Sequence, residues 1–163
     1  MMDVIMDADI ANIFGKIDKI DLLKELFPKS RLFVCAAVRN ELERAKLSGY
    51  TFVDNVLRHT TITEPTEKEA KMTQKIFSKR TIGKGETESI AIANNRKMLL
   101  LTNDRIAEKE AAKTGVETMN IAMLLRQLWK NSVISQEFVK TIISDMEEKC
   151  RIKIVNAEEI FKE

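Results

Sequence analysis

The feature that most limits how this chain can fold is a repeated alternation between short apolar runs and longer segments with helical spacing of apolar residues. An alternation of this kind is typical of an α/β protein with a mostly parallel sheet. The predicted strands cover residues 3–6, 31–34, 60–63, 98–101 and 115–118. We therefore expect an α/β fold with a central parallel sheet of four or five strands.

The segments between these strands are predicted helices, which cover residues 8–26 with a break near Asp18, 35–47, 50–58, 66–79, 85–96, 104–113 and 119–131. A further amphipathic helix is expected from Ser135, because a Ser-X-Glu start precedes Phe138, Ile142 and Met146 at helical spacing. The tail after this helix either adds an edge strand and a last turn of helix or exchanges onto a partner chain.

The residue counts restrict the kinds of site that the chain can carry. A length of 163 residues fits one domain, and 44% hydrophobic with 32% charged residues is the composition of a globular protein. Cys35 and Cys150 are isolated and His59 is the only histidine, so a zinc site of the Cys/His type lacks ligands. A Ser-His-Asp triad would need His59, which lies in a predicted helix end or loop. Any metal is therefore expected to be held by oxygen.

The charge pattern bears on the cellular compartment and the partner. No apolar run approaches the roughly 20 residues that cross a bilayer. Asp3, Asp7 and Asp9 occupy the N-terminus, where a signal peptide needs basic residues. We expect a cytoplasmic protein that does not bind a membrane. The net charge of +2 leaves a nucleic-acid partner open, because local Lys and Arg clusters could still bind one.

Two aspartates directly follow apolar strands. Asp7 follows residues 3–6, and Asp104 follows residues 98–101 after Thr102 and Asn103. If these strands pair in parallel, both carboxylates emerge at the carboxyl edge of the sheet, where α/β proteins bind ligands. Each aspartate taken alone is equally well explained as a helix N-cap, and Asp9 as a first-turn acid that compensates the helix dipole.

Three glutamates lie on predicted helices in positions that could bring them to the same edge. Glu41 falls beside the apolar stripe of its helix, with Val38 and Leu42, where a carboxylate is costly unless something pairs with it. Glu86 and Glu88 both lie in the first turn of the next long helix, and they point in nearly opposite directions. A snorkelling side chain explains Glu41 alone, and the helix dipole explains the other two.

Taken together, these acids point to a metal site more strongly than any one of them does alone. Carboxylates crowded together repel one another unless a cation neutralises them. Magnesium and similar hard cations prefer carboxylate oxygen and keep several waters. Convergence of the strand-end aspartates with the helical glutamates therefore predicts a divalent-metal site.

The order and spacing of these motifs over roughly residues 3–130 resemble a PIN domain, a small α/β fold of metal-dependent ribonucleases that includes many prokaryotic toxins of toxin-antitoxin pairs. "VIMDAD", "VRNEL", "GKGETESIAIA" and "LLLTND" are similar to four motifs of the family, the third to a "GEAEAIALA" run of one prokaryotic subgroup. The resemblance implies a three-layer α/β/α PIN-like fold, with a nuclease domain over residues 1–131 and a helical C-terminal extension over residues 132–163.

The resemblance also implies a site and an activity. The catalytic and metal-binding residues would be Asp7, Glu41, Glu86 and Asp104, with Glu88 and Asp9 in reserve and Thr102 and Asn103 in support. Mg²⁺ or Mn²⁺ would activate a water for in-line attack on an RNA phosphodiester. Implied partners are RNA, an antitoxin protein and a second copy of the chain. Candidate RNA contacts are Lys79, Arg80, Lys84 and Arg105, although such side chains usually only solvate a surface.

Two other interpretations compete with the nuclease. A phosphatase of the haloacid-dehalogenase-like type also opens on a strand with Asp-X-Asp, but it needs a lysine and a later acidic pair, and the predicted strand over residues 115–118 offers no such pair. A PIN module that binds RNA or protein without cleaving it would share the fold. Metal-dependent cleavage that Asp7→Asn abolishes would separate this module from a nuclease.

Overall fold

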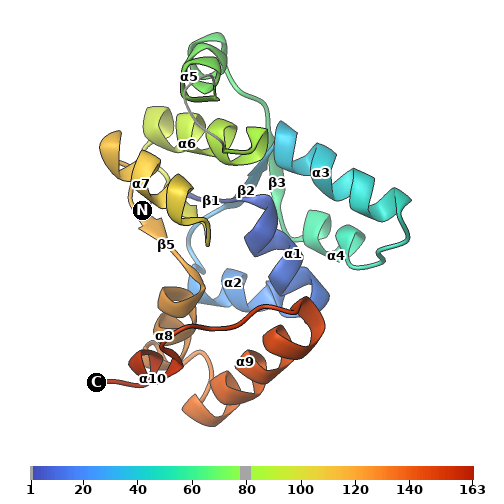
Figure 1. Cartoon of the computed structure of the whole chain (residues 1–163), viewed down its shortest axis with the longest axis vertical. Helices are drawn as coiled ribbons and strands as arrows, with labels where there is room; N and C mark the ends of the chain where they lie inside the picture. The colour runs from blue at the N-terminus through green and yellow to red at the C-terminus, as the bar shows by residue number, and fades with distance from the viewer. Residues whose placement is uncertain (1, 78–81) are drawn as a thin grey trace.

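The computed structural model describes residues 2–77 and 82–163, in which five parallel strands form one sheet (Figure 1). The strands are β1 (Val4–Met6), β2 (Leu32–Cys35), β3 (Thr61–Thr63), β4 (Leu99–Leu101) and β5 (Thr118–Met119). The strand order is β3-β2-β1-β4-β5, so β1 is central, with β2 and β3 on one side and β4 and β5 on the other. The parallel sheet predicted from the apolar runs is confirmed.

The two strands that precede the aspartates are neighbours at the centre of the sheet. Val4 pairs with Leu99 and Met6 pairs with Leu101 in parallel register. The amide of Asp7 continues the ladder by donating to the carbonyl of Leu101 at 3.1 Å. Both strands are buried along their length, as expected for a central strand covered on both faces. This register confirms that Asp7 and the residues after Leu101 leave the sheet at the same carboxyl edge.

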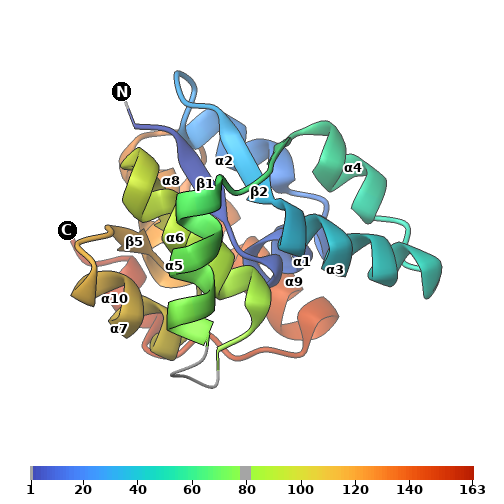
Figure 2. The same ribbon diagram turned by 90° about the horizontal axis from the view of Figure 1, so that it is seen from above.

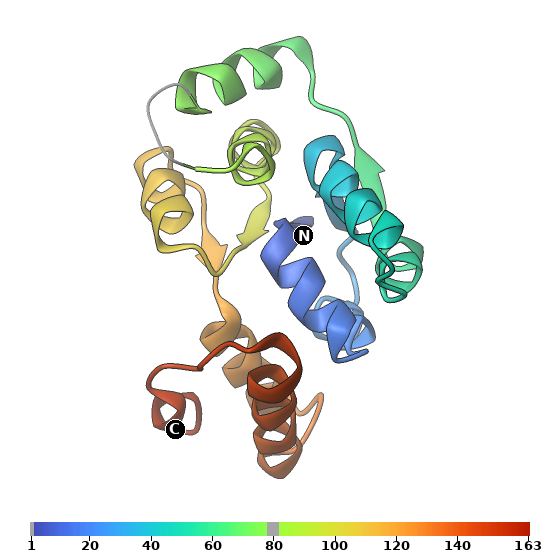
Figure 3. The ribbon, with the colours of Figure 1, turned by 45° about the vertical axis from the view of Figure 1, so that its right-hand side comes forward.

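Helices cover both faces of the sheet and complete a three-layer α/β/α fold (Figures 2 and 3). The helices are α1 (Ala8–Lys16), α2 (Ile20–Leu26), α3 (Ala36–Leu47), α4 (Val53–Arg58), α5 (Glu67–Phe77), α6 (Lys84–Arg96), α7 (Arg105–Lys113), α8 (Ile121–Lys130), α9 (Gln136–Cys150) and α10 (Ala157–Ile160). Helix α6 lies against β1, β2 and β4, and α5 and α7 pack beside it. Figure 1 shows α1, α2 and α8 on the opposite side of the sheet.

The predicted break near Asp18 is confirmed, and its cause is local. Asp18 has a φ of 57°, which is left-handed and cannot continue a helix. The amide of Lys19 then donates to the carbonyl of Phe14 at 2.9 Å and closes the end of α1. The chain therefore turns and starts α2.

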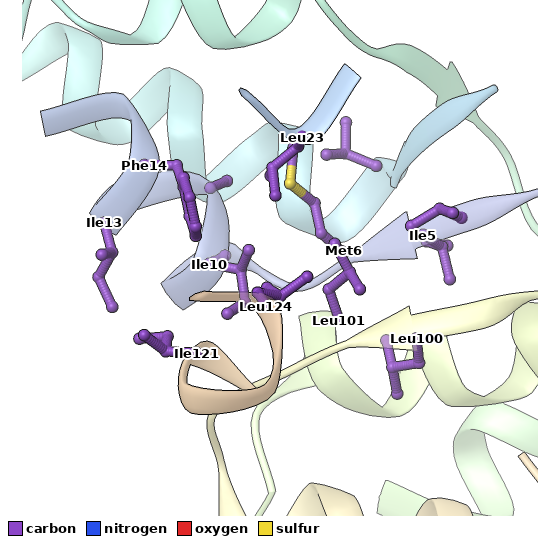
Figure 4. Close-up of a cluster of buried hydrophobic side chains, with 14 of the residues drawn as sticks. Ile5, Met6, Ile10, Ile13, Phe14, Leu23, Leu100, Leu101, Ile121 and Leu124 are labelled. Carbon is purple, nitrogen blue, oxygen red and sulfur yellow. The ribbon is translucent and has the colours of Figure 1, made fainter. Parts of the chain in front are cut away.

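The core joins the central strands to α1 and α8. Ile5 and Met6 of β1 meet Leu100 and Leu101 of β4, and every one of these side chains is fully buried. Figure 4 shows this cluster with the apolar faces of α1 and α8 around it, which contribute Ile10, Ile13, Phe14, Ile121 and Leu124. Packing of both helices on the strands that lead to Asp7 and Asp104 holds the carboxyl edge in place.

A buried ion pair joins α5 to the end of α6. The carboxylate of Glu69 has no exposed surface, and its Oε1 accepts from Arg96 Nε at 2.9 Å. Asn95 Nδ2 donates to the same oxygen at 2.8 Å, and the amide of Thr66 donates to Oε2 at 2.8 Å. Although burial alone would raise it, these donors lower the pKa of Glu69 to about 2. The network stabilises the outer layer away from the carboxyl edge.

The C-terminal part packs on the same body. Helix α9 contacts α1 and α8. The expected last turn of helix is present as α10, but within the described residues the expected edge strand does not form after Cys150. Arg151 and Asn156 have left-handed φ values of 54°, so any extended run in the tail is limited to the four residues between them. Trp129 Nε1 donates to the carbonyl of Ile160 at 2.7 Å and ties α10 to α8.

The structure also bears on the expected last strand, the place of His59 and the expected lack of a membrane-spanning segment. The last strand is Thr118–Met119 rather than residues 115–118, because Gly115, with a φ of 79°, still belongs to the turn that ends α7. His59 ends α4, as expected, and its Nδ1 lies 2.8 Å from the carbonyl of Asn55. Among the helices of the described residues, none combines the length and the apolar character needed to span a bilayer.

Candidate metal centre

Asp7 lies at the point where the central strand becomes a helix. It has an extended backbone, and its side chain caps α1 by accepting from the amide of Ile10 at 3.0 Å through Oδ1. Its other oxygen, Oδ2, accepts from the Thr102 hydroxyl at 2.5 Å. The carboxylate is fully buried. The helix cap expected for this residue is therefore real, and it holds a carboxylate in a position where burial of the charge is costly.

The environment of Asp7 favours its protonated form. Burial is the main cause, and it raises the pKa from 3.8 to about 7, although the hydrogen bonds from Thr102 and Ile10 act in the opposite direction. The negative charges of Asp9 and Glu86 raise the pKa further. A buried acid whose pKa lies near neutrality at a ligand-binding edge is a typical mark of a functional site.

Thr102 connects the two strand-end aspartates. Its hydroxyl donates to Asp7 and accepts from the amide of Asp104 at 3.2 Å. Asp104 in turn caps α7 with one oxygen, Oδ1, which accepts from the amides of Ile106 and Ala107 at 2.8 and 3.0 Å. Thr102 is fully buried. This hydroxyl therefore links the Asp7 carboxylate to the backbone of Asp104.

Glu41 approaches this edge from α3. Val38 and Leu42 of the same helix are fully buried and Glu41 is half-buried, as the apolar stripe predicts. Burial raises the pKa of Glu41, and the charge of Glu86 raises it further. A Cβ at Gly85 would lie 2.7 Å from Glu41 Oε1 and 3.0 Å from Val38 Cγ2. Glycine at position 85 therefore leaves the space in which the Glu41 carboxylate lies, a requirement that the sequence did not reveal.

Glu86 opens α6 on the same side. Gly83 is the N-cap of this helix, and backbone amides of Gly83 and Glu86 lower the pKa of the Glu86 carboxyl, so the side chain folds back over the start of its own helix. Burial is the larger influence and raises this pKa, and the charges of Asp9 and Asp104 raise it further. Glu86 thus faces the acids at the carboxyl edge.

Glu88 has a different environment. It is 6% exposed, and its Oε2 accepts from the amide of Ala37 at 2.8 Å. Ala37 lies in the first turn of α3, which has no side-chain cap of its own. Glu88 therefore caps a neighbouring helix from α6. At least one oxygen of Glu88 is therefore engaged at the start of α3.

Five carboxylates repel one another across the edge, and we name them the acid cluster: Asp7, Asp9, Glu41, Glu86 and Asp104. The pKa values of Asp7, Asp9, Glu41 and Glu86 are each raised first by burial and then by the charge of another member. Within residues 2–77 and 82–163, no three acidic, histidine or cysteine side chains converge closely enough to form a ready metal cage. The structure thus brings the predicted acids to one edge without closing them around a point.

The chemistry of the acid cluster fits a hard divalent cation. Every candidate ligand is a carboxylate oxygen, which suits Mg²⁺ or Mn²⁺. A cation would relieve both the repulsion and the burial cost that raise these pKa values. Several of the acids also accept hydrogen bonds from backbone amides at a helix start. These bonds hold the carboxylates apart from one another although their charges face the same space.

The other predicted contacts have mixed outcomes. Asn103 Oδ1 accepts from the amide of Ile121 at 3.3 Å and so positions the start of α8. Lys84 and Arg105 are exposed at the starts of α6 and α7, close in sequence to Glu86 and Asp104. Lys79 and Arg80 lie outside the described residues.

Comparison with known proteins gives a family and a fold. A family model described as a PIN domain (DUF3368) matches residues 3–162. No curated protein sequence matches the chain.

Several solved structures share the fold at low sequence identity. The VapBC2 complex from Rickettsia felis, bound to a DNA fragment from its promoter, has a TM-score of 0.60 at 15% identity, covering 73% of this chain and 98% of that chain. VapBC-1 from nontypeable Haemophilus influenzae has a TM-score of 0.57 at 15% identity, with the same coverage of 73% and 98%. DNA-bound VapBC from Salmonella typhimurium has a TM-score of 0.56 at 15% identity, covering 74% and 98%.

Proposed function

The chain belongs to the PIN-domain family, and on this premise we propose that it is a metal-dependent endoribonuclease. The observation that carries the proposal is the acid cluster, in which burial and the charges of neighbouring members raise the pKa values of Asp7, Glu41 and Glu86 at the carboxyl edge. Such repulsion is costly in a purely structural device, whereas a divalent cation would relieve it.

The proposed ligands are Asp7, Glu41, Glu86 and Asp104, with Asp9 in reserve. Mg²⁺ or Mn²⁺ bound there would supply an activated water and neutralise charge on the phosphodiester. The chain itself positions the ligands, because the Thr102 hydroxyl is hydrogen-bonded both to the Asp7 carboxylate and to the amide of Asp104. Lys84 and Arg105 are proposed to hold RNA phosphates beside the acids.

The first experiment measures cleavage of single-stranded RNA with Mg²⁺, with Mn²⁺ and with a chelator, alongside Mn²⁺ affinity. We expect metal-dependent cleavage that Asp104→Asn reduces by at least about a hundredfold, together with weaker Mn²⁺ binding. Asp21→Asn, an exposed acid in the first turn of α2, is the matched control and should leave both unchanged. Full cleavage by Asp104→Asn would show that the assigned site is wrong. Metal-free RNA binding without cleavage by the unaltered chain would instead favour the non-cleaving module.

We also propose that the chain is the toxin of a toxin-antitoxin pair, acts in the cytoplasm and forms a homodimer. The fold shared with VapBC complexes supports this proposal. Inducing the chain in bacteria should arrest growth, and Asp7→Asn should remove the arrest. Normal growth with soluble, active protein present would refute the toxin role. A family match over residues 3–162 leaves little support for the phosphatase alternative.

We further propose that residues 1–131 form the nuclease unit and residues 132–163 a helical extension of it. The contacts of α9 with α1 and α8 support an extension packed on the same body. Deleting residues 132–163 would expose the apolar faces of α1 and α8, so the truncated chain should lose solubility. A soluble truncated chain that cleaves RNA normally would show that the extension is dispensable.

A further inference from the structure

A hollow of about 200 Å³ lies beside the chain segment that carries Asp104, one member of the acid cluster. It is formed by the first turns of α7 and α8 and by residues 153–155 of the C-terminal tail. Asn103 and Arg105, the residues on either side of Asp104, both line it. Anything bound in this hollow would therefore adjoin the proposed metal site.

The hollow has a positive charge balance. Arg105 and Lys153 both line it and both are exposed. In the part of the chain that the structure describes, neither forms an ion pair or a side-chain hydrogen bond. The acid in its lining, Glu108, accepts a hydrogen bond from Asn120 Nδ2 at 3.2 Å. Two cations against one engaged carboxylate favour an anionic ligand.

The tail that supplies Lys153 is anchored rather than loosely attached. Ile154 is 8% exposed within the core, and its amide donates to Glu147 Oε1 at 3.4 Å. Lys153 and Val155, on either side of this anchor, both line the hollow. The extension beyond the predicted nuclease unit therefore contributes directly to the surface beside the acid cluster.

The hollow also offers polar and apolar contacts. Asn103 commits its Oδ1 to the amide of Ile121, which leaves the Nδ2 hydrogens as donors toward a ligand. Val155 also lines the hollow, and its apolar side chain is 62% exposed. A phosphate, a hydrogen-bond acceptor and an apolar face are together what a nucleotide of a single strand presents.

We propose that this hollow binds a nucleotide that adjoins the cleaved linkage of single-stranded RNA. Arg105 and Lys153 contact its phosphate, Asn103 donates to its base or sugar, and the exposed Val155 side chain packs against the base. The proposal rests on the nuclease function proposed above, since a nucleotide in the hollow would adjoin the cleaved linkage only if Asp104 belongs to the cleavage site. It makes the C-terminal extension part of substrate selection.

The test separates binding from cleavage. Binding of a fluorescein-labelled single-stranded RNA is measured on the Asp7→Asn protein, with salt titration. Adding Lys153→Ala should weaken binding about threefold to tenfold and reduce the salt slope by about 0.7. The control is Lys149→Ala, which removes the same charge from an exposed position in the last turn of α9 that does not line the hollow. It should change neither quantity.

A second measurement locates the contact. Methylphosphonate linkages, which carry no charge, replace the phosphates of the RNA one at a time. Weakened binding should occur at a linkage next to the cleaved one, and this effect should vanish when Arg105→Ala and Lys153→Ala are combined, because the partner charges are then absent.

The outcomes are distinguishable. Equal losses in Lys153→Ala and Lys149→Ala, or a flat methylphosphonate scan, would overturn the subsite even if the chain cleaves RNA normally. Such a result would point to a protein-docking role for the hollow. Binding that depends on Lys153 in a chain that fails to cleave would support the subsite and refute the nuclease.

Discussion

The Asp7→Asn substitution should stabilise the metal-free protein at alkaline pH although it destroys the proposed site. Burial raises the pKa of Asp7 from 3.8 to about 7. The unfolded chain thus loses this proton near pH 3.8 and the folded protein keeps it until about pH 7, so stability falls across that interval and stays low above it. The full shift corresponds to at most about 4 kcal/mol. Asparagine removes the charge and still caps a helix.

Urea or thermal unfolding with a chelator, at pH 5 and pH 8, measures this effect. At pH 8 we expect Asp7→Asn to unfold about 5–10 °C above the unaltered chain, which corresponds to about 2–3 kcal/mol for a domain of this size. At pH 5 the difference should shrink, because the folded carboxyl is then largely protonated. Mn²⁺ at a hundred times its Kd should add about 2.7 kcal/mol to the unaltered chain and much less to the variant.

Two results would refute this reasoning. One is a variant that is equally stable or less stable than the unaltered chain at pH 8, since the buried carboxylate of Asp7 would then not destabilise the folded protein. The other is a stability difference that is the same at pH 5 and pH 8, since a titrating carboxyl must make it depend on pH.

Three further predictions follow from contacts around the site and in the outer layer. Glu88→Gln should cost about 1 kcal/mol of stability through the weakened cap on α3 and leave Mn²⁺ affinity unchanged. Glu86→Gln should weaken Mn²⁺ binding and leave the stability nearly unchanged. Calorimetric titration and urea unfolding of both variants measure these effects, and exchanged results would mean that Glu88 is the metal ligand. Gly85→Ala should lower cleavage at least tenfold with a stability loss of about 1 kcal/mol, because a Cβ there meets Glu41 Oε1 at 2.7 Å; kinetics equal to those of the unaltered chain would contradict the crowding. The lowered pKa of Glu69, about 2, stabilises the fold above about pH 4.5 and is lost as the pH falls toward 2. Urea unfolding of Glu69→Gln should show a loss of about 2 kcal/mol at pH 7 and a weaker dependence on acid pH; a stability equal to that of the unaltered chain would contradict it.

The predicted and observed positions of the strand-end aspartates agree, because local pattern carries this information. An apolar run followed by aspartate predicts a buried strand and a residue at its carboxyl end, and Asp7 and the residues after Leu101 do leave the sheet together. The same pattern predicts a cap, and the capping bond of Asp7 to Ile10 is present as well. Both interpretations hold for this residue, so the local pattern could not choose between them.

The roles of Glu86 and Glu88 show where sequence information ended. The two residues lie about 200° apart around a helix axis, so one of them had to turn away from the edge. Which one does so depends on how α6 packs against α3, where Glu88 meets the amide of Ala37. The space that Gly85 leaves for Glu41 depends on the same packing.

By itself, the sequence determined the order of strands and helices, the buried centre of the sheet and the presence of carboxylates at strand ends, because these depend on the spacing of residues along a short stretch. Only the tertiary structure decided which carboxylates share one space, that Thr102 joins Asp7 to Asp104, and that the tail brings Lys153 to the hollow that Asn103 and Arg105 line. The physical reason is distance: charge repulsion, crowding and hydrogen bonding act between atoms that are close in space, and residues far apart along a chain come close only when it folds.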